Sequence, residues 1–365
     1  MSRFFDQRLA ALAPYTPGEQ PREARRWIKL NTNESPFPPA PGVAAVLATA
    51  ADSLRLYPDP TCGALRQAAA ARYRLSPQQV FVANGSDEVL AFCFRGLCPQ
   101  GALFPDLTYG FYPVFCRMFG VRYQEVPLDD AFCVRPADYQ GRAGTIFLAN
   151  PNAPSGLALS LAQIETLLAQ DRERLVVVDE AYVDFGAESA LGLLARYDNL
   201  LVTQTFSKSR ALAGGRLGLA FGSEALIADL ERLKYSFNPY SVNRLTLLAG
   251  EAALQDEAYF RACCDAIMAN RALAAEGLRG LGCRLTESLA NFLLVAAPGL
   301  SGAAYQAALR EAGILVRYFD QPRIRDYVRI SIGSREEMLA LLAATRQILE
   351  RGNAHAAGKP GTHDE

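Results

Sequence analysis

The chain has 365 residues, of which 50% are hydrophobic and 21% are charged, and its 37 basic side chains nearly balance 38 acidic ones. At roughly 100–200 residues per domain, this length predicts about two domains. The net charge of −1 gives no electrostatic basis for binding nucleic acid or an anionic membrane. We therefore expect a soluble globular protein that acts on small molecules.

Histidine is almost absent from the sequence. Its two histidines, His355 and His363, lie in the segment AHAAGKPGTHDE. We expect residues 353–365 to be disordered, because this segment is polar and contains glycine and proline. The rest of the chain then has no histidine for a zinc site or a Ser-His-Asp triad, and we predict no metal site. Proton transfer must fall to other side chains or to a cofactor.

The eight cysteines include no C-x-x-C pair, and a chain of this length needs no disulfides to fold. We therefore expect reduced cysteines in a cytoplasmic protein. Residues 1–15 lack the basic and apolar regions of a signal peptide. The uncharged stretches 143–164 and 288–309 contain Asn, Gly, Pro and Ser, so we do not expect them to span a membrane.

The first expected element is an extended arm over residues 1–42, because the prolines at positions 36, 38, 39 and 41 prevent a helix there. Over residues 43–240, short apolar runs alternate with helical patterns. The expected strands and helices are QQVFVANG, DEVLAFCFRGL, TIFLANPN, LSLAQIETLLAQ, RLVVVDEAY and NLLVTQTFS, in that order. This α/β alternation predicts a large domain with a mainly parallel sheet covered by helices.

Residues 241–352 are expected to form a bridging helix and a smaller domain. The Ala- and Leu-rich stretch 242–281 predicts one long helix. After it come four short strand-like runs, CRLTES, NFLLVAA, ILVRYF and YVRISIG, and helical patterns at 302–312 and 335–351. This mixture predicts an α+β domain.

A turn between a strand and a helix, Asn84-Gly85-Ser86-Asp87-Glu88, has the pattern of an anion site. Gly85 permits a sharp turn, and the first amides of the following helix are free to bind a phosphate. An ordinary helix cap by Ser86 or Asp87 is the alternative interpretation.

An aspartate, Asp179, ends the apolar strand VVVD. Ligands of open α/β sheets bind beyond the carboxyl ends of the strands, so Asp179 could pair there with a protonated ring nitrogen. Tyr182 lies three residues further on and could reach the same ligand. A capping aspartate and a surface tyrosine are the alternative.

One lysine, Lys208, follows a strand within the glycine-rich segment TFSKSRALAGGRLG. A lysine with its free pKa of about 10.4 is a nucleophile at neutral pH only if its surroundings lower that pKa. Burial beside Arg216 would do so, whereas a solvated lysine would not react. The sequence has no G-x-G-x-x-G and no P-loop motif, so neither nucleotide fingerprint is present.

Taken in order, eight segments resemble the fold-type I pyridoxal-phosphate (PLP) aminotransferases, and most of all the histidinol-phosphate aminotransferase family. They are YTPGEQP, IKLNTNESPFPP, LYPDP, NGSDE, NPNAPSG, DEAYVDF, FSKSRALAGGRLG and VRISIGSREE. The resemblance extends from residue 15 to residue 351. It implies the PLP-transferase fold, with a large and a small domain.

The resemblance also implies roles around the cofactor ring. Lys208 would bond to the aldehyde of PLP and then act as the base that moves the proton of the substrate. Asp179 would keep the pyridine nitrogen protonated, which makes the ring an electron sink. Tyr182 would hydrogen-bond the ring hydroxyl, and Tyr109 would stack on the ring.

Other residues would bind the cofactor phosphate. By resemblance, the amides of Ser86 and Asp87 would hold it, and Ser207 and Arg216 would donate further hydrogen bonds. Tyr57 would reach the phosphate of the neighbouring subunit's cofactor. The resemblance therefore implies a homodimer with shared active sites.

Two arginines would bind the substrates. Arg329 would hold the carboxylate of glutamate or 2-oxoglutarate and, together with Arg317, the phosphate of the amino-alcohol substrate, because a guanidinium grips either anion bidentately. Tyr15 and Asn33 on the proline-rich arm would close over the substrate. Surface ion pairs are the alternative for Arg317 and Arg329.

The sequence departs from the family pattern at one position. Most relatives have asparagine where this chain has Ala153, and that asparagine contacts the ring hydroxyl. Either Tyr182 makes this contact alone or Asn152 shifts to help.

The reaction implied by the resemblance converts histidinol phosphate and 2-oxoglutarate to imidazole-acetol phosphate and glutamate, in histidine biosynthesis. Two other reactions on the same fold remain open, namely decarboxylation of threonine phosphate and transamination of aromatic amino acids. A PLP-fold protein without catalytic activity that serves as a binding module is the alternative from a different class. Such a protein would be expected to lack the lysine, the aspartate or the arginines, and all of them are present.

Overall fold

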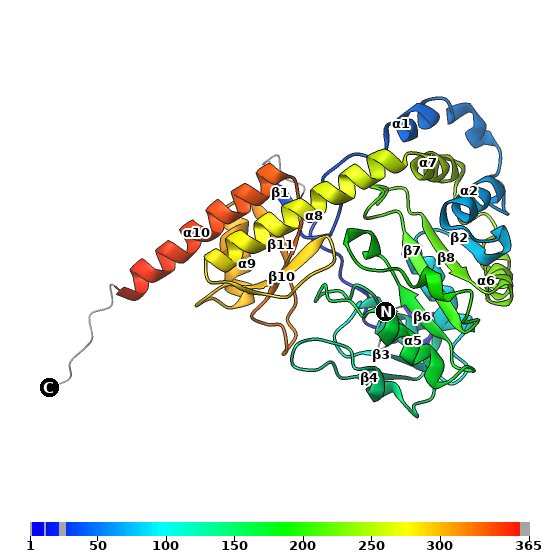
Figure 1. The fold of residues 1–365 in the computed structure, drawn as a ribbon, viewed down its shortest axis with the longest axis horizontal. Helices are drawn as coiled ribbons and strands as arrows, with labels where there is room; N and C mark the ends of the chain where they lie inside the picture. The colour runs from blue at the N-terminus through cyan, green and yellow to red at the C-terminus, as the bar shows by residue number, and fades with distance from the viewer. Residues whose placement is uncertain (1, 11, 22–26, 358–365) are drawn as a thin grey trace.

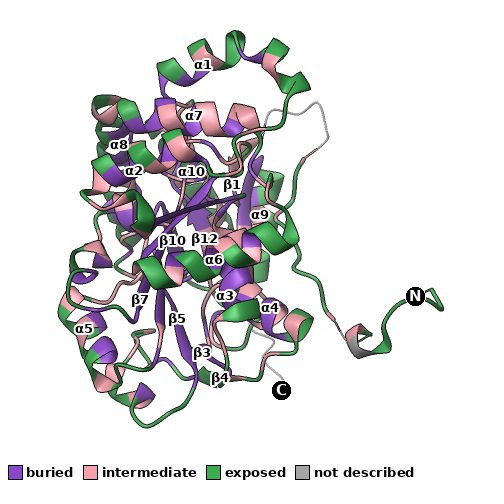
Figure 2. Ribbon diagram, turned by 90° about the vertical axis from the view of Figure 1, so that its right-hand side faces the viewer, coloured by how far each residue is buried: buried purple, intermediate pink, exposed green. Residues whose placement is uncertain are grey.

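Two β-sheets, each covered by helices, form the two parts of the chain in a computed structural model that describes residues 2–10, 12–21 and 27–357. The long helix α8 (Glu257–Gly280) extends from one part to the other (Figure 1). The buried strands lie inside, and the outward faces of the helices are exposed (Figure 2).

The larger sheet has seven strands in the order β2-β8-β7-β6-β5-β3-β4. In chain order they are β2 (Val80–Ala83), β3 (Ala102–Pro105), β4 (Tyr123–Val126), β5 (Thr145–Ala149), β6 (Val176–Asp179), β7 (Leu200–Thr205) and β8 (Gly218–Gly222). Neighbouring strands are parallel except for β8, which is antiparallel to both β2 and β7. The predicted mainly parallel sheet is therefore present.

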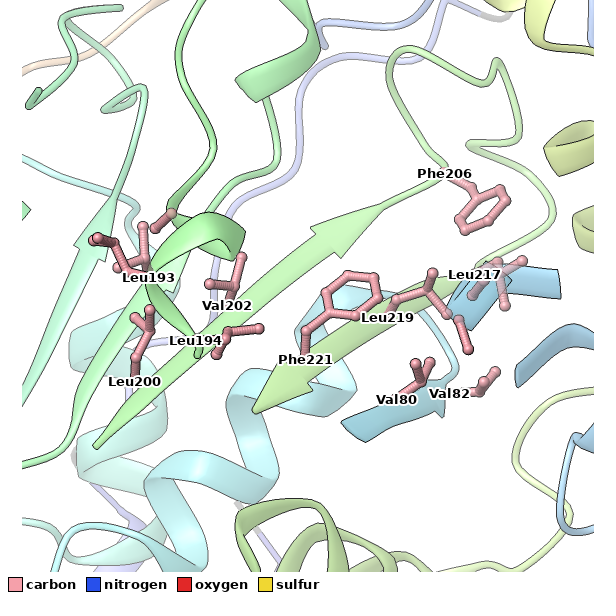
Figure 3. Packing of buried hydrophobic residues seen from close by; sticks show 14 of the residues in the cluster. Val80, Val82, Leu193, Leu194, Leu200, Val202, Phe206, Leu217, Leu219 and Phe221 are labelled. Carbon is pink, nitrogen blue, oxygen red and sulfur yellow. The ribbon is translucent and has the colours of Figure 1, made fainter. Parts of the chain in front are cut away.

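Apolar side chains from several strands pack on one side of this sheet. Val80 and Val82 of β2 lie close to Leu219 and Phe221 of β8 (Figure 3), and all four are fully buried. The helices around the sheet are α1 (Pro41–Ala48), α2 (Gly63–Tyr73), α3 (Ser86–Gly96), α4 (Phe111–Phe119), α5 (Leu161–Gln170), α6 (Glu224–Phe237) and α7 (Arg244–Gln255). Burial of strands on both faces explains their continuous apolar sequences.

The prediction of one helix over 242–281 was wrong, because α7 and α8 are separate helices. They meet at Asp256, whose carboxylate accepts a hydrogen bond from the backbone N of Tyr259 at 3.0 Å and so caps the start of α8. A side chain that satisfies a free helical amide stabilises a new helix start at that position.

The smaller sheet has the order β1-β11-β12-β10-β9. Its strands are β1 (Ile28–Leu30), β9 (Arg284–Leu285), β10 (Phe292–Ala296), β11 (Ile314–Tyr318) and β12 (Val328–Ser331), and α9 (Gly302–Glu311) and α10 (Arg335–Ala357) accompany them. Strand β1 pairs in parallel with β11. Residues 28–30 of the predicted arm are thus part of the second sheet.

The C-terminal helix is longer than expected. Helix α10 continues through Ala357, so the expected disorder of 353–365 is wrong for residues 353–357, where no proline interrupts the helix. Residues 358–365, with His363, lie outside the described residues. All eight cysteines are unpaired, and among the described residues no helix is long and apolar enough to span a membrane.

Candidate active site

A cavity of about 420 Å³ lies where β5, β6 and β7 end, and residues from both parts of the chain line it. Ala149, Asp179 and Thr205, the last residues of these three strands, all contribute to its wall. The cavity brings together most of the predicted site residues: Tyr15, Asn33, Asp87, Tyr109, Asp179, Tyr182, Ser207, Lys208, Arg216, Arg317 and Arg329. This position agrees with the rule for ligands of α/β sheets.

Lys208 extends into this cavity from the turn that follows β7. Its Nζ donates to the backbone oxygen of Thr32 at 3.4 Å and lies 5.7 Å from the ring centroid of Tyr182. Burial, together with the positive charge of Arg329, lowers the pKa of Lys208 to about 8. With this pKa, about a tenth of the amine is neutral and nucleophilic at pH 7, far more than for a free lysine with its pKa of about 10.4.

Asp179 is buried at the end of β6, with 4% of its surface exposed. Its Oδ2 accepts a hydrogen bond from the hydroxyl of Tyr112 at 3.1 Å, and its Oδ1 accepts one from the backbone N of Ala181 at 3.3 Å. Burial raises the pKa of Asp179 to about 7. A buried carboxylate in this setting is stabilised by a cationic partner, such as a protonated ring nitrogen.

Tyr112 was not predicted from the sequence. It is fully buried and lies three residues after Tyr109, a spacing that places two side chains on the same side of a helical turn. This spacing was the available signal, but the contact with Asp179 spans 67 residues of sequence.

Asn33 forms hydrogen bonds with three residues that are distant in sequence, Tyr182, Ser331 and Asn291. Its Nδ2 donates to the hydroxyl of Tyr182 at 3.1 Å, its backbone N donates to Oγ of Ser331 at 2.8 Å, and its backbone oxygen accepts from Nδ2 of Asn291 at 3.0 Å. The φ angle of Asn33 is 55°, a left-handed conformation that asparagine tolerates better than most residues. Sequence reasoning missed the supporting roles of Ser331 and Asn291.

The turn before α3 has the features of a phosphate site. The N-cap of α3 is Gly85, which has no side chain to cap the helix, so neither Ser86 nor Asp87 is the helix cap. Gly218 lies so close that a Cβ there would be 2.4 Å from the backbone N of Ser86. The free amides at a helix N-terminus bind anions, so the turn fits a phosphate group.

Arg216 brings positive charge to this turn. Its Nη2 is 3.1 Å from Oδ2 of Asp87, and its Nη1 donates to Oγ of Ser207 at 3.4 Å. The hydroxyl of Tyr109 donates to Oδ1 of Asp87 at 2.8 Å. The side chain of Asp87 therefore orients Arg216 and Tyr109, a role that the sequence did not predict.

Two arginines of the small sheet, Arg317 and Arg329, also line the cavity. Nη2 of Arg329 donates to the backbone oxygen of Asn31 at 3.5 Å, and its guanidinium lies 5.3 Å from the ring centroids of both Phe292 and Phe319. Arg317 donates to the backbone oxygens of residues 16 and 17 at 2.8 and 3.0 Å. Among the described residues, no carboxylate forms an ion pair with either arginine, so the surface ion-pair alternative is wrong.

The remaining predicted residues have different positions. Tyr15 stacks on Phe111 with ring centroids 4.4 Å apart and lines the cavity. Tyr57 is 77% exposed, stacks on Tyr240 and does not line the cavity.

Asn152, predicted to contact the cofactor, does not line the cavity either. Its Oδ1 accepts from the hydroxyl of Thr108 at 2.8 Å, and its Nδ2 donates to the backbone oxygen of Leu107 at 2.9 Å. Both ends of its side-chain amide are therefore bonded to residues 107 and 108. Ala153, the next residue, lines the cavity instead. In this structure Asn152 does not replace the asparagine that Ala153 removes.

Comparisons with known proteins agree with this geometry. The profile of the family "Aminotransferase class I and II" matches residues 25–344. Histidinol-phosphate aminotransferase 1 of Bradyrhizobium diazoefficiens is 51% identical over 351 residues, covering 96% of this chain and 100% of the relative. Histidinol-phosphate aminotransferase 2 of Dechloromonas aromatica is 52% identical over 355 residues, covering 95% and 99%.

The fold also matches solved structures. The histidinol-phosphate aminotransferase of Sinorhizobium meliloti, solved in complex with pyridoxal-5'-phosphate, superimposes with a TM-score of 0.84, covering 96% of this chain and 99% of that one at 24% identity. The prediction of a fold-type I architecture is therefore confirmed. With its matching fold, its matching profile and relatives of about half-identical sequence, the chain belongs to the class I and II aminotransferase family.

Proposed function

We propose that the chain is a PLP-dependent aminotransferase that transfers the amino group of histidinol phosphate to 2-oxoglutarate, in histidine biosynthesis. The observation that carries this proposal is one cavity holding a lysine of lowered pKa, Lys208, and two arginines, Arg317 and Arg329, that pair with no carboxylate in the described part of the chain. The names of the curated relatives, with identities of about 50%, support the choice of substrate.

The residues of the cavity fit the cofactor. When bound, pyridoxal phosphate supplies an aldehyde that captures primary amines and a cationic ring that withdraws electrons. Asp179 is the buried acid that would hold a proton on the ring nitrogen, and the turn at Gly85 with Arg216 would bind the phosphate. The ring hydroxyl would be left to Tyr182, whose own hydroxyl Asn33 already holds in place.

The proton transfer falls to Lys208. With its Nζ free, Lys208 would be the base inside the cavity. Its lowered pKa leaves part of the amine unprotonated near neutral pH, so Nζ would accept the proton of the substrate carbon and hold it for return to the product. Tyr15 and the 31–34 segment form part of the cavity wall beside this amine.

The arginines explain how one cavity serves two substrates in turn. Histidinol phosphate carries a phosphate and 2-oxoglutarate a carboxylate, and a guanidinium binds both kinds of anion bidentately. Because the two substrates use the same arginines, they cannot bind together. The reaction therefore follows a ping-pong order.

Spectra of the half-reactions test this function. The protein with PLP is expected to show the absorption band of the covalent lysine–cofactor bond, and histidinol phosphate should abolish this band faster than phenylalanine. Lys208→Ala should lose the band and nearly all turnover. Release of CO₂ from threonine phosphate without a 2-oxo acid would show the decarboxylase, and a faster reaction with phenylalanine would show the aromatic enzyme.

We further propose a cytoplasmic homodimer in which Tyr57 binds the phosphate of the partner's cofactor. The side chain of this tyrosine is 77% exposed, although its backbone oxygen accepts a hydrogen bond from Nη2 of Arg244, and this exposure supports a contact with a second copy. Eight unpaired cysteines fit a reducing compartment. Light scattering should give twice the mass of the chain, and Tyr57→Phe should weaken PLP binding.

A further inference from the structure

Lys234 is a buried lysine that the proposed reaction does not use. It lies on α6 with 1% of its surface exposed. Its Nζ donates to the backbone oxygens of Pro60 and Val82 at 3.4 and 3.2 Å and to Sγ of Cys62 at 3.5 Å. Lysine is almost never buried without a compensating role, since removing its charge from water is costly.

Two of these three acceptors belong to the segment 57–62. The segment begins at the exposed Tyr57 and ends at Cys62, which has a φ of 53° and precedes α2. The carboxylate of Asp59 accepts from the backbone N of Thr61 at 2.9 Å and of Gly63 at 2.8 Å. A non-glycine residue keeps a left-handed conformation only where its surroundings impose it.

The third acceptor fixes Lys234 to the large sheet. Val82 is in β2, where it pairs with Leu219 of β8, and both side chains are fully buried. The ammonium also lies 5.6 Å from the ring centroid of Phe81, at a distance where a cation is attracted to an aromatic face. Lys234 therefore joins the 57–62 segment to a rigid part of the core.

We propose that Lys234 is a positioning residue that fixes the 57–62 segment on β2, so that Tyr57 is presented to the active site of a second copy of the chain. This inference rests on the shared-site homodimer proposed above. It predicts that Lys234 acts in trans: its loss weakens the cofactor site of the partner and leaves the site of its own protomer intact.

The first experiment measures the affinity of the homodimer for PLP from the covalent absorption band. Lys234→Met removes the three donated hydrogen bonds while keeping the side-chain volume, and we expect about a tenfold weaker affinity, the effect of about one lost hydrogen bond. Arg66→Met is the matched control. The side chain of Arg66 joins the same region through Glu231 and the backbone oxygen of Pro77. Its backbone N donates to the backbone oxygen of Cys62 at 2.9 Å, a bond that Arg66→Met keeps, so this variant should leave the affinity unchanged.

Hybrid dimers separate action in trans from action in cis. In a hybrid of a Lys234→Met protomer with a Lys208→Ala protomer, the single lysine-bearing site receives Tyr57 from the protomer with intact Lys234. Its affinity should match a hybrid of wild type with Lys208→Ala. When both substitutions are on one protomer and the other is wild type, the lysine-bearing site should bind PLP about tenfold more weakly.

The opposite pattern, weak binding in the first hybrid and normal binding in the second, would overturn the inference. If the Lys234→Met chain does not fold, Lys234→Gln takes its place in the same hybrids. Glutamine has no charge and a shorter side chain than lysine, so we expect the same pattern between the two hybrids, with a smaller loss of affinity. If Tyr57→Phe binds PLP more weakly and Lys234→Met binds it as tightly as the wild type, the role of Lys234 is refuted and the shared site is not. A monomeric wild-type chain, or unchanged affinity in Tyr57→Phe, refutes the shared site itself.

Discussion

Arg317 and Arg329 occupy directly opposite positions of the antiparallel pair β11–β12. Like charges facing each other across two strands destabilise the pair, and the described residues provide no carboxylate that neutralises them. An anion bound between them removes this repulsion. The β-sheet thus holds an anion site ready before any substrate arrives.

Substitution of the two arginines should separate their roles. A charge-assisted bidentate contact contributes about 1.5–3 kcal/mol, so we expect Arg329→Met to lower kcat/KM about 100-fold for both histidinol phosphate and 2-oxoglutarate. Arg317→Met should lower kcat/KM only about tenfold. Both Nη atoms of Arg317 already donate to the backbone oxygens of residues 16 and 17, so this arginine has less hydrogen-bonding capacity left for a substrate. The control is Arg325→Met, because Arg325 is exposed and lies in the loop that connects β11 to β12. Equal losses in all three variants would contradict the assignment.

The pH dependence of cofactor capture should report Lys208. Because burial and Arg329 lower its pKa to about 8, the rate of formation of the covalent band should rise with pH and level off above about 8. A free alkyl amine would continue to gain up to its pKa of about 10.4. Removal of the nearby charge in Arg329→Met should move the midpoint to higher pH. Stopped-flow absorbance over pH 6–10 measures both; an unmoved midpoint in the variant would be evidence against the Arg329 effect.

The stability of the cofactor-free chain should depend on the protonation of Asp179. Burial raises the pKa of this carboxyl from 3.8 to about 7, so between these values the folded chain holds a proton that the unfolded chain has lost. Its contribution to stability is complete below pH 3.8 and is lost as pH rises to about 7.

Thermal unfolding of the cofactor-free protein from pH 5 to 8 should therefore show a falling Tm, and Asp179→Asn should flatten part of this slope. Glu180, also buried, with a pKa raised to about 7, accounts for a further part. Bound PLP should reduce the slope in the wild type, because its cationic ring pairs with the carboxylate. An identical slope in Asp179→Asn and wild type would exclude this coupling.

Two glycines of the same segment test the phosphate turn. A Cβ at Gly218 would lie 2.4 Å from backbone atoms of Gly85 and Ser86, whereas a Cβ at Gly214 meets nothing within 4 Å. Gly218→Ala should therefore displace the turn and weaken PLP binding by about tenfold or more, with little effect on pyridoxal, which has no phosphate. Gly214→Ala should bind both normally. Calorimetric titration of both ligands distinguishes a lost phosphate contact from general disruption.

Much of the site was predictable because its residues are at the ends of apolar strands. Asp179 follows three valines, and Lys208 follows the strand of residues 200–205, and parallel strands place their carboxyl ends along one edge of the sheet. These patterns left a capping aspartate and a solvated lysine as alternatives, and the resemblance of eight ordered segments to a known family predicted that the two residues share one site.

Other features depend on contacts between distant residues, which one sequence does not reveal. The hydrogen bond from Tyr112 to Asp179 and the contacts of Asn33 with Ser331 and Asn291 are of this kind. The separation of α7 from α8 was missed for a different reason. Helical patterns continue on both sides of Asp256, and a single capping side chain decides where the second helix starts.

The pairing of β1 with β11 ties the segment that follows β1, residues 31–34, to the small sheet. Residues 28–30 are bonded into the small sheet, and the next four residues form part of the cavity wall, where the backbone oxygen of Thr32 accepts from Nζ of Lys208. The chain then enters the large domain at α1. Because β1 is paired with β11, any displacement of the small sheet relative to the large one would also displace this part of the cavity wall and the backbone oxygen that Nζ of Lys208 contacts.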